Sequence, residues 1–207
     1  MEERTKALRQ SEQQLLDVFE GTIAAFARTV EARDPYTAGH QEHVAELATE
    51  IARKLDLDAE TVEATRVAGL LHDVGKISIP AEILTKPTRL APVEWEMIKL
   101  HPEHAYRILE GIQFPWPIAE IVLQHHERLD GSGYPRGLQE DQILLAARIL
   151  CVADTVEAMA SHRPYRAAVG LDAALDVIRQ GAATAYDPAV VDACIELFEQ
   201  EGFSFPE

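Results

Sequence analysis

The stretch TVEATRVAGLLHDVGKISIP, residues 61–80, carries most of the information about how this chain folds. Its first part has apolar side chains at helical spacing up to Leu71, and Asp58 stands where an N-cap belongs. We expect one helix here, ended by Gly75, and a further helix with Pro80 in its first turn. His72 and Asp73 close the apolar run, which places two metal-binding side-chain types at the end of a core helix.

Helical spacing continues over nearly the whole chain on both sides of this stretch. Further helices are expected at about 38–55, 144–160, 171–180 and 188–200, and Pro92 resembles another first-turn proline. The clearest loop is DGSGYP, residues 130–135, and no convincing alternation typical of a strand is present. We therefore predict an all-α fold, a compact bundle of about eight helices.

The first 20 residues differ from the rest because they are mainly polar. Leu8 and Leu15 are one heptad apart, a spacing that fits a short coiled coil, although a frayed terminal helix fits it too. We divide the chain into an N-terminal signalling-type helix, residues 1–20, and a main domain, residues 21–207. The helix could link the domain to an upstream sensor or receiver domain and could form a homodimer.

Composition restricts the setting in which the protein works. The 207 residues carry a formal net charge of −16, which argues against binding to DNA or RNA. No window of 18 apolar residues suggests a membrane span, and the charged start is unlike a secretion signal. Cys151 and Cys194 lack a Cys-x-x-Cys pairing and are interpreted as buried thiols in a reducing compartment, so we expect a cytoplasmic protein.

The histidines are the residues that indicate chemistry. All eight lie between positions 40 and 162, and His40, His101, His125 and Asp154 come from helices other than the one that His72 and Asp73 close. Imidazoles with carboxylates suit iron, manganese, nickel or zinc, whereas the lack of cysteine ligands argues against a structural zinc site.

Two pairs of adjacent residues suggest two ions. Neighbours on a helix point about 100° apart, so His72 and Asp73, or His125 and His126, should not chelate one ion side by side. They could serve two ions a few ångströms apart, with Asp73 bridging, as a two-metal phosphodiesterase requires. A His-Asp pair alone carries little weight; the ordered combination with its flanking residues carries the prediction.

That combination is similar to a known family. The matching stretches are EARDPYTAGHQEHV (31–44), LLHDVGKISIP (70–80), HPEHAYRIL (101–109), HHERLDGSGYP (125–135), RILCVADTVEAM (148–159) and RPYR (163–166). From position 31 onward the chain resembles the HD-GYP family, the output domain of bacterial cyclic di-GMP signalling.

The resemblance implies an HD-domain helical bundle that hydrolyses cyclic di-GMP with a binuclear metal centre. One ion would take His40, His72, Asp73 and Asp154, and the other Asp73, His101 and His125. The ions would be divalent transition metals, iron or manganese first, with nickel or zinc as alternatives.

The resemblance also implies roles in substrate binding. Lys76 would act with Asp73 in catalysis by holding a non-bridging phosphate oxygen. Arg163 and Arg166 would form a second phosphate clamp, and Tyr134 with Gly133 would shape the substrate pocket. Glu127 and Asp130 would support the ligands from behind through hydrogen bonds.

The chain departs from the family pattern at a few positions. Some members bind a third ion through a glutamate that is Tyr36 here, so His126 would be left as a weak ligand or a pocket wall. We therefore expect two ions and, as the main product, the linear dinucleotide pGpG. Glu157 stands where an aspartate is usual and should still act behind the ligands, while His43 and His162 replace other residues without loss of activity.

Two other functions stay open from the sequence. One is a catalytically weak sensor or adaptor domain for cyclic di-GMP. The other is a phosphohydrolase for another cyclic dinucleotide or for nucleotides. The retained His-Asp core favours an enzyme over the first, and the intact GYP loop favours cyclic di-GMP over the second.

Overall fold

A computed structural model describes residues 2–33, 39–161 and 170–205 of the chain, and in these residues it contains helices and no β-strand. The all-α prediction is confirmed. The helices are α1 (Glu2–Glu31), α2 (His40–Lys54), α3 (Ala59–Leu71), α4 (Ala81–Leu84), α5 (Pro92–Ile98), α6 (His101–Leu109), α7 (Ile118–Gln124), α8 (Leu145–Ala160), α9 (Leu171–Gln180) and α10 (Pro188–Glu199), with two short 3-10 helices, η1 (Val74–Ser78) and η2 (Glu140–Gln142).

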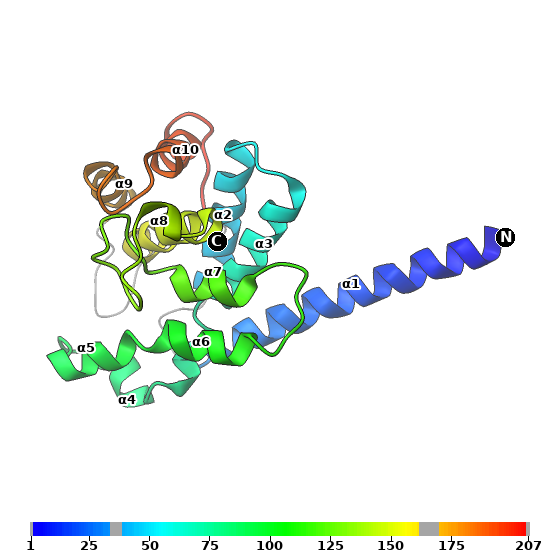
Figure 1. Ribbon diagram of the computed structural model, residues 1–207, viewed down its shortest axis with the longest axis horizontal. Helices are drawn as coiled ribbons and strands as arrows, with labels where there is room; N and C mark the ends of the chain where they lie inside the picture. The colour runs from blue at the N-terminus through cyan, green and yellow to red at the C-terminus, as the bar shows by residue number, and fades with distance from the viewer. Residues whose placement is uncertain (1, 34–38, 162–169, 206–207) are drawn as a thin grey trace.

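Helix α2 lies at the centre of the bundle. It packs against α3 on one side and α8 on the other, and α10 also contacts it. Its core face repeats at helical spacing through Val44, Leu47, Ala48 and Ile51, which are all fully buried. Helices α9 and α10 cover α8 at one side of the molecule, while α6 and α7 lie at the other (Figure 1).

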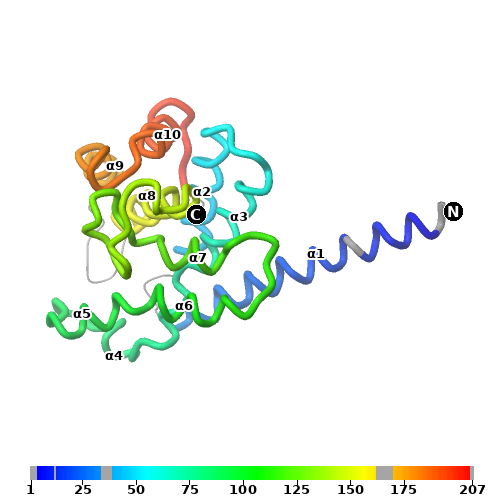
Figure 2. The backbone as a smooth tube through the Cα atoms, viewed as in Figure 1, coloured from blue at the N-terminus to red at the C-terminus, as the bar shows by residue number. Residues whose placement is uncertain are grey.

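Helix α1 is one continuous helix of 30 residues, so the proposed division at residues 20 and 21 falls inside it. Its second half is anchored in the core by Ile23, Ala27 and Val30. Its first half extends away from the bundle (Figure 2). Along the part of the chain that the structure describes, no helix has both the length and the apolar character needed to cross a membrane.

Helix α3 begins as expected and ends earlier than expected. The Asp58 carboxylate caps it by accepting a hydrogen bond from the Thr61 N–H at 2.9 Å. The helix ends at Leu71, and Gly75 lies within the separate helix η1. Gly75 is needed there for packing, because a Cβ atom would lie 1.9 Å from the His101 carbonyl oxygen of α6.

The prolines differ in their positions. Pro92 is the first residue of α5, as predicted, whereas Pro80 precedes α4 as its N-cap and is not in its first turn. Ala91, before Pro92, has no side chain that could cap α5. The Glu94 carboxylate compensates by accepting the Ala91 N–H at 2.7 Å.

Candidate metal centre

Histidines from several elements meet in the interior of the bundle. His40 begins α2, His72 follows α3, His101 begins α6 and His125 follows α7. Two groups form, one of His40, His72 and Asp73 and one of His101, His125 and His126. Within each group the potential ligand atoms all lie within 4.8 Å of one another.

Asp73 stands between the two groups. Its Oδ2 atom lies 3.5 Å from His72 Nε2 and 3.7 Å from His40 Nε2. Its Oδ1 atom lies 3.5 Å from His101 Nε2. One carboxylate therefore faces both groups with different oxygen atoms, which is the arrangement that a bridging ligand needs.

Backbone carbonyls orient three of the imidazoles. The Nδ1 atoms of His72, His101 and His125 donate to the carbonyl oxygens of Gly69, Ile98 and Val122, at 2.7, 2.8 and 2.5 Å. Each acceptor lies three residues earlier, in the last turn of a helix, where carbonyls lack helical partners. Since Nδ1 carries the proton in each case, Nε2 points inward as an unprotonated donor for a cation.

The inward nitrogen atoms fit a metal ion. The Nε2 atom of His72 is buried and has no hydrogen-bond partner among the described residues. The Nε2 atoms of His101 and His125 face each other at 3.3 Å, although neither carries a proton to share. Buried lone pairs that converge in this way are satisfied by a shared cation, and the imidazole and carboxylate donors suit a divalent metal.

Burial keeps two of these rings neutral. It lowers the pKa of His101 to about 4, against a partly opposing effect of Asp73, and lowers that of His125 to about 3. Neutral imidazole is the form that binds a metal, so both rings are ready to coordinate at neutral pH.

His40 has a different environment, set by two carboxylates. Its Nδ1 atom bonds to Glu157, and its Nε2 atom lies 3.3 Å from Asp154 Oδ1. Burial opposes the charged ring, but Asp154 and Glu157 outweigh it and raise the pKa of His40 to about 9, so an ion bound at Nε2 would have to displace a proton. The Glu157 carboxylate also accepts a hydrogen bond from the Ser161 hydroxyl at 2.6 Å. It contacts His40 on the Nδ1 side of the ring, away from Asp73 and Asp154.

The structure places both adjacent pairs just beyond the end of a helix, so the helical-spacing argument against a shared ion does not apply to them. Helix α7 ends at Gln124 and α3 at Leu71, so His125–His126 and His72–Asp73 follow their helices and escape the 100° spacing. The ring centroids of His125 and His126 lie 4.0 Å apart. The Nδ1 atom of His126 lies 3.9 Å from Asp154 Oδ2. His126 is thus part of the cluster.

The loop after His126 folds back onto its own start. The buried Glu127 carboxylate accepts the N–H groups of Arg136 at 2.7 Å and Leu138 at 2.9 Å. Gly133 passes so close that a Cβ atom would lie 2.5 Å from the Glu127 Cα atom. This fold places the Tyr134 ring 4.7 Å from that of His126.

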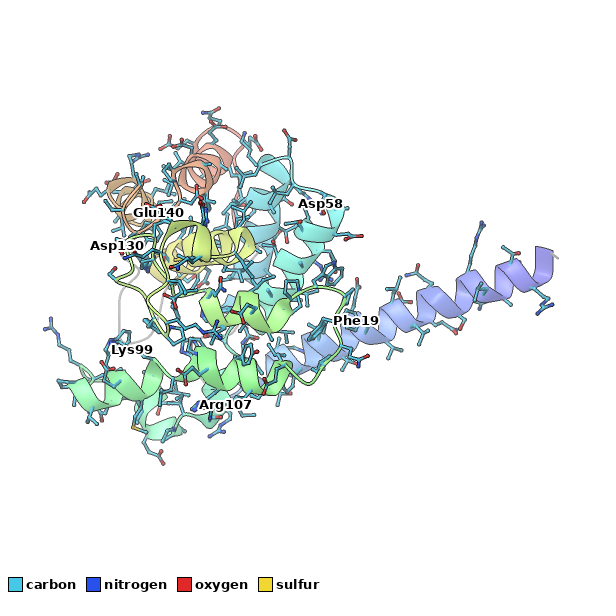
Figure 3. The ribbon with its side chains drawn as sticks, viewed as in Figure 1. Phe19, Asp58, Lys99, Arg107, Asp130 and Glu140 are labelled. Atoms are coloured by element: carbon cyan, nitrogen blue, oxygen red, sulfur yellow. The ribbon has the colours of Figure 1, made fainter. Side chains whose placement is uncertain are left out.

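Among the described residues, the Glu127 and Asp130 carboxylates hydrogen-bond to backbone N–H groups of the loop and not to the proposed ligands. Glu127 holds the loop through backbone N–H groups. Asp130 is exposed, and its carboxylate accepts the Ser132 N–H at 2.9 Å (Figure 3). Both residues shape the loop that carries Tyr134.

Lys76 and Tyr134 line a cavity of about 330 Å³ that opens beside the cluster. The Lys76 ammonium donates to Asp73 Oδ2 at 2.6 Å. The cavity is lined by His40, Asp73, Lys76, Ile83, Leu84, Lys86, Leu90, Trp95, Ile98, His101, His126, Tyr134, Asp154 and Ala158. The wall from α4 and α5 was not predicted, because a lone tryptophan in a short helix does not indicate a cavity.

Four residues singled out from the sequence lie outside the described part of the chain. They are Tyr36, His162, Arg163 and Arg166. The phosphate clamp of the two arginines and the effect of Tyr36 on a third ion therefore stay predictions.

Two groups of His and Asp side chains inside a helical bundle are typical of a metal-binding helical domain. The model of the HD domain family matches residues 24–190, so the chain belongs to the HD domain family.

Two curated relatives agree with this assignment, and one solved structure has the same fold. The 3'3'-cGAMP-specific phosphodiesterase 3 of Vibrio cholerae is 39% identical over 89% of this chain and 41% of its own. The cyclic di-GMP phosphodiesterase response regulator RpfG of Xanthomonas campestris is 42% identical over 84% of this chain and 47% of its own. The structure of Bd1817, an HDG"Y"P protein from Bdellovibrio bacteriovorus, shares the fold, with a TM-score of 0.64 and 19% identity over 77% of this chain and 51% of that one.

The resemblance to the HD-GYP family is thereby confirmed. The chain spans less than half the length of the two curated relatives.

Proposed function

We propose that the chain is a metal-dependent phosphodiesterase that hydrolyses cyclic di-GMP, mainly to pGpG. The observation that carries the proposal is Asp73, which faces both histidine groups and contacts Lys76 beside the cavity. The name of the relative from Xanthomonas campestris supports the same substrate.

In this proposal His40, His72, Asp73 and Asp154 hold one divalent ion, and Asp73, His101 and His125 hold the second. The short distances of Asp73 to both groups support the bridge. His126 is near enough to add a ligand. Iron or manganese is our first choice, with nickel or zinc as alternatives. The chemistry that such ions supply when bound is polarisation of the phosphate and activation of water for attack on phosphorus.

The protein's own residues bind and orient the substrate. The Lys76 ammonium, already at the cavity, holds a non-bridging phosphate oxygen and stabilises its growing negative charge. Glu157 holds the His40 ring in place, and Tyr134 forms part of the wall beside His126. Gly133 allows the loop to pass closely enough to place that ring.

The test is product analysis with three substrates. Metal-loaded protein is incubated with cyclic di-GMP, 3'3'-cGAMP and cyclic di-AMP, products are separated by chromatography, and bound metal is measured by elemental analysis. We expect pGpG from cyclic di-GMP and about two ions per protomer. Preferred cleavage of 3'3'-cGAMP, the substrate named for the relative from Vibrio cholerae, would replace the proposed substrate. Binding without turnover would make the chain a sensor.

Lys76→Ala is expected to keep the metal ions and to lower kcat about 10²-fold, because a charge stabiliser is removed while the histidine groups remain. Steady-state kinetics and elemental analysis on the same preparation measure both effects. Lys54→Ala serves as a control that should leave kcat unchanged, since Lys54 is not in the cavity lining and pairs with Glu196 and Glu201, at 2.9 and 2.6 Å. A loss of metal in Lys76→Ala would assign Lys76 a structural role instead.

We also propose that α1 forms a homodimer with α1 of a second copy. Leu8 and Leu15, one heptad apart, are 60% and 69% exposed on the projecting part of the helix. Leu8→Glu with Leu15→Glu is expected to give a monomer in light scattering, because charges would replace the apolar stripe. Gln10→Glu, on the same helix, should leave the dimer intact. A monomeric unmodified protein would contradict the proposal.

We also propose a cellular location and a partner domain for the enzyme. Both cysteines are buried and free, which supports a reducing, cytoplasmic location. A sensor or receiver domain that signals through α1 is the partner that we propose for the projecting helix.

A further inference from the structure

Helix α5 is attached directly to the histidine cluster. The carbonyl oxygen of Ile98, its last residue, accepts the His101 Nδ1 proton at 2.8 Å. Trp95 lies one turn earlier, with its carbonyl oxygen accepting the Lys99 N–H at 3.1 Å. Residues three apart share a helix face, so Trp95 and Ile98 form one wall of the cavity beside His101.

The cavity has two chemically different sides. His40, Asp73, Lys76 and Asp154 make one part of the lining polar and charged. Helices α4 and α5 and the segment between them contribute Ile83, Leu84, Leu90, Trp95 and Ile98, together with Lys86, whose ammonium is paired with Glu94. A ligand that fills such a cavity combines an anionic part with a flat apolar part.

Trp95 is the largest side chain on the apolar side, and 45% of its surface is exposed. An indole usually gains more by burying its ring, so an exposed indole on a cavity wall is suited to stacking with a ligand. A second aromatic ring, that of Tyr134, lines the same cavity. The Nζ atom of Lys99, directly after α5, lies 5.9 Å from the centre of that ring.

We propose that Trp95 is a base-binding residue whose indole stacks on a purine base of the cyclic dinucleotide while a phosphate of the same molecule lies at Asp73 and Lys76. The inference rests on the proposed function and adds the residue that recognises the nucleoside part. Stacking uses the π face that every base has, so Trp95 favours nucleotide diesters over simple diesters and does not separate guanine from adenine.

The chain contains two tryptophans, which makes a direct measurement available. Trp116 lies in a different pocket, with Phe114 and Ile118, so Trp116→Phe leaves Trp95 as the single tryptophan emitter. Manganese-loaded Trp116→Phe is mixed with cyclic di-GMP in a stopped-flow fluorimeter, and emission is followed before turnover. We expect the emission of Trp95 to be quenched in a saturable way. The single variant Trp95→Ala, which keeps Trp116 as its emitter, should show no quenching.

Kinetics provide the second measurement. Trp95→Ala is expected to raise KM for cyclic di-GMP about tenfold or more with a small change in kcat, because the stack is present in the bound substrate and in the transition state alike. Trp95→Phe should recover most of the affinity, since it keeps an aromatic face. The ratio of kcat/KM for cyclic di-GMP to that for methyl p-nitrophenyl phosphate, which has no base, should fall by a similar factor in Trp95→Ala.

The outcomes separate the two proposals. Hydrolysis of cyclic di-GMP with an unchanged KM in Trp95→Ala and no quenching in Trp116→Phe would overturn the role of Trp95 and leave the enzyme proposal intact. Quenching without hydrolysis of any cyclic dinucleotide would overturn the enzyme proposal and support Trp95 as a base-binding residue. Circular dichroism checks that each variant is folded, and the Trp116→Phe measurement does not depend on altering Trp95.

Discussion

Asp73→Ala is expected to remove both metal ions and to abolish hydrolysis while leaving a folded helical domain. The two carboxylate oxygens face different histidine groups, so a single substitution opens both proposed coordination shells. Removal of a single charge-stabilising donor usually lowers kcat roughly 10²–10³-fold. The decrease for Asp73→Ala should be larger, because both ions are lost with this ligand. Elemental analysis, cyclic di-GMP turnover and circular dichroism on one preparation measure the three parts of this prediction.

A matched control lies at the other end of the same helix. Asp58 caps the N-terminus of α3, and Asp73 follows its C-terminus. Asp58→Ala should lower the stability of the domain through the lost cap and leave the metal content unchanged. If Asp73→Ala retained both ions and full activity, the bridging role would have to be abandoned.

Gly75→Ala is expected to have the largest effect on stability. The added Cβ atom would lie 1.9 Å from the His101 carbonyl oxygen and 2.6 Å from the Ala105 backbone nitrogen, and neither is a flexible side chain that could move away. Helix η1 must then separate from α6, which moves Asp73 away from His101. We expect a loss of about 3 kcal/mol in the free energy of unfolding and reduced metal binding, measured by urea unfolding and elemental analysis.

Gly21→Ala provides the comparison for this substitution. Gly21 lies within α1, and a Cβ atom there meets nothing within 4 Å, so alanine should stabilise the helix by about 0.5–1 kcal/mol. Equal stability of Gly75→Ala and the unmodified protein would show that η1 and α6 can part without cost, contrary to the packing argument.

The helices could be predicted from the sequence because their signals are local. Helix α10 shows this best, since Asp187 caps it through the Ala189 N–H at 3.0 Å and Pro188 is its first residue. The end of α3 could not be predicted in the same way. Gly75 suggested a helix end, but its position reflects contact with α6, about 25 residues further along the chain.

The residues of the candidate site were named from the family resemblance, and their arrangement was only partly foreseen. Helical spacing predicted that the side chains of His125 and His126 point in different directions. In the structure both belong to one group of potential ligands, because α7 ends at Gln124, directly before the pair. Trp95 drew no attention in the sequence, since a lone tryptophan in a short helix gives no hint that it lines a cavity with His101.

By itself the sequence determined that the chain is helical, where most helices lie and which side chains carry metal-binding chemistry. Spacing, caps and prolines act within a few residues, so they can be read along the chain. Only the tertiary structure decided which oxygen of Asp73 faces which histidine group, that the Glu157 carboxylate bonds to Nδ1 of His40, and that α5 brings Trp95 to the cavity. The contacts of Asp73 with His101 and of Glu157 with His40 join residues more than 20 positions apart. They exist because the elements pack closely, as η1 and α6 do where only a glycine fits between them.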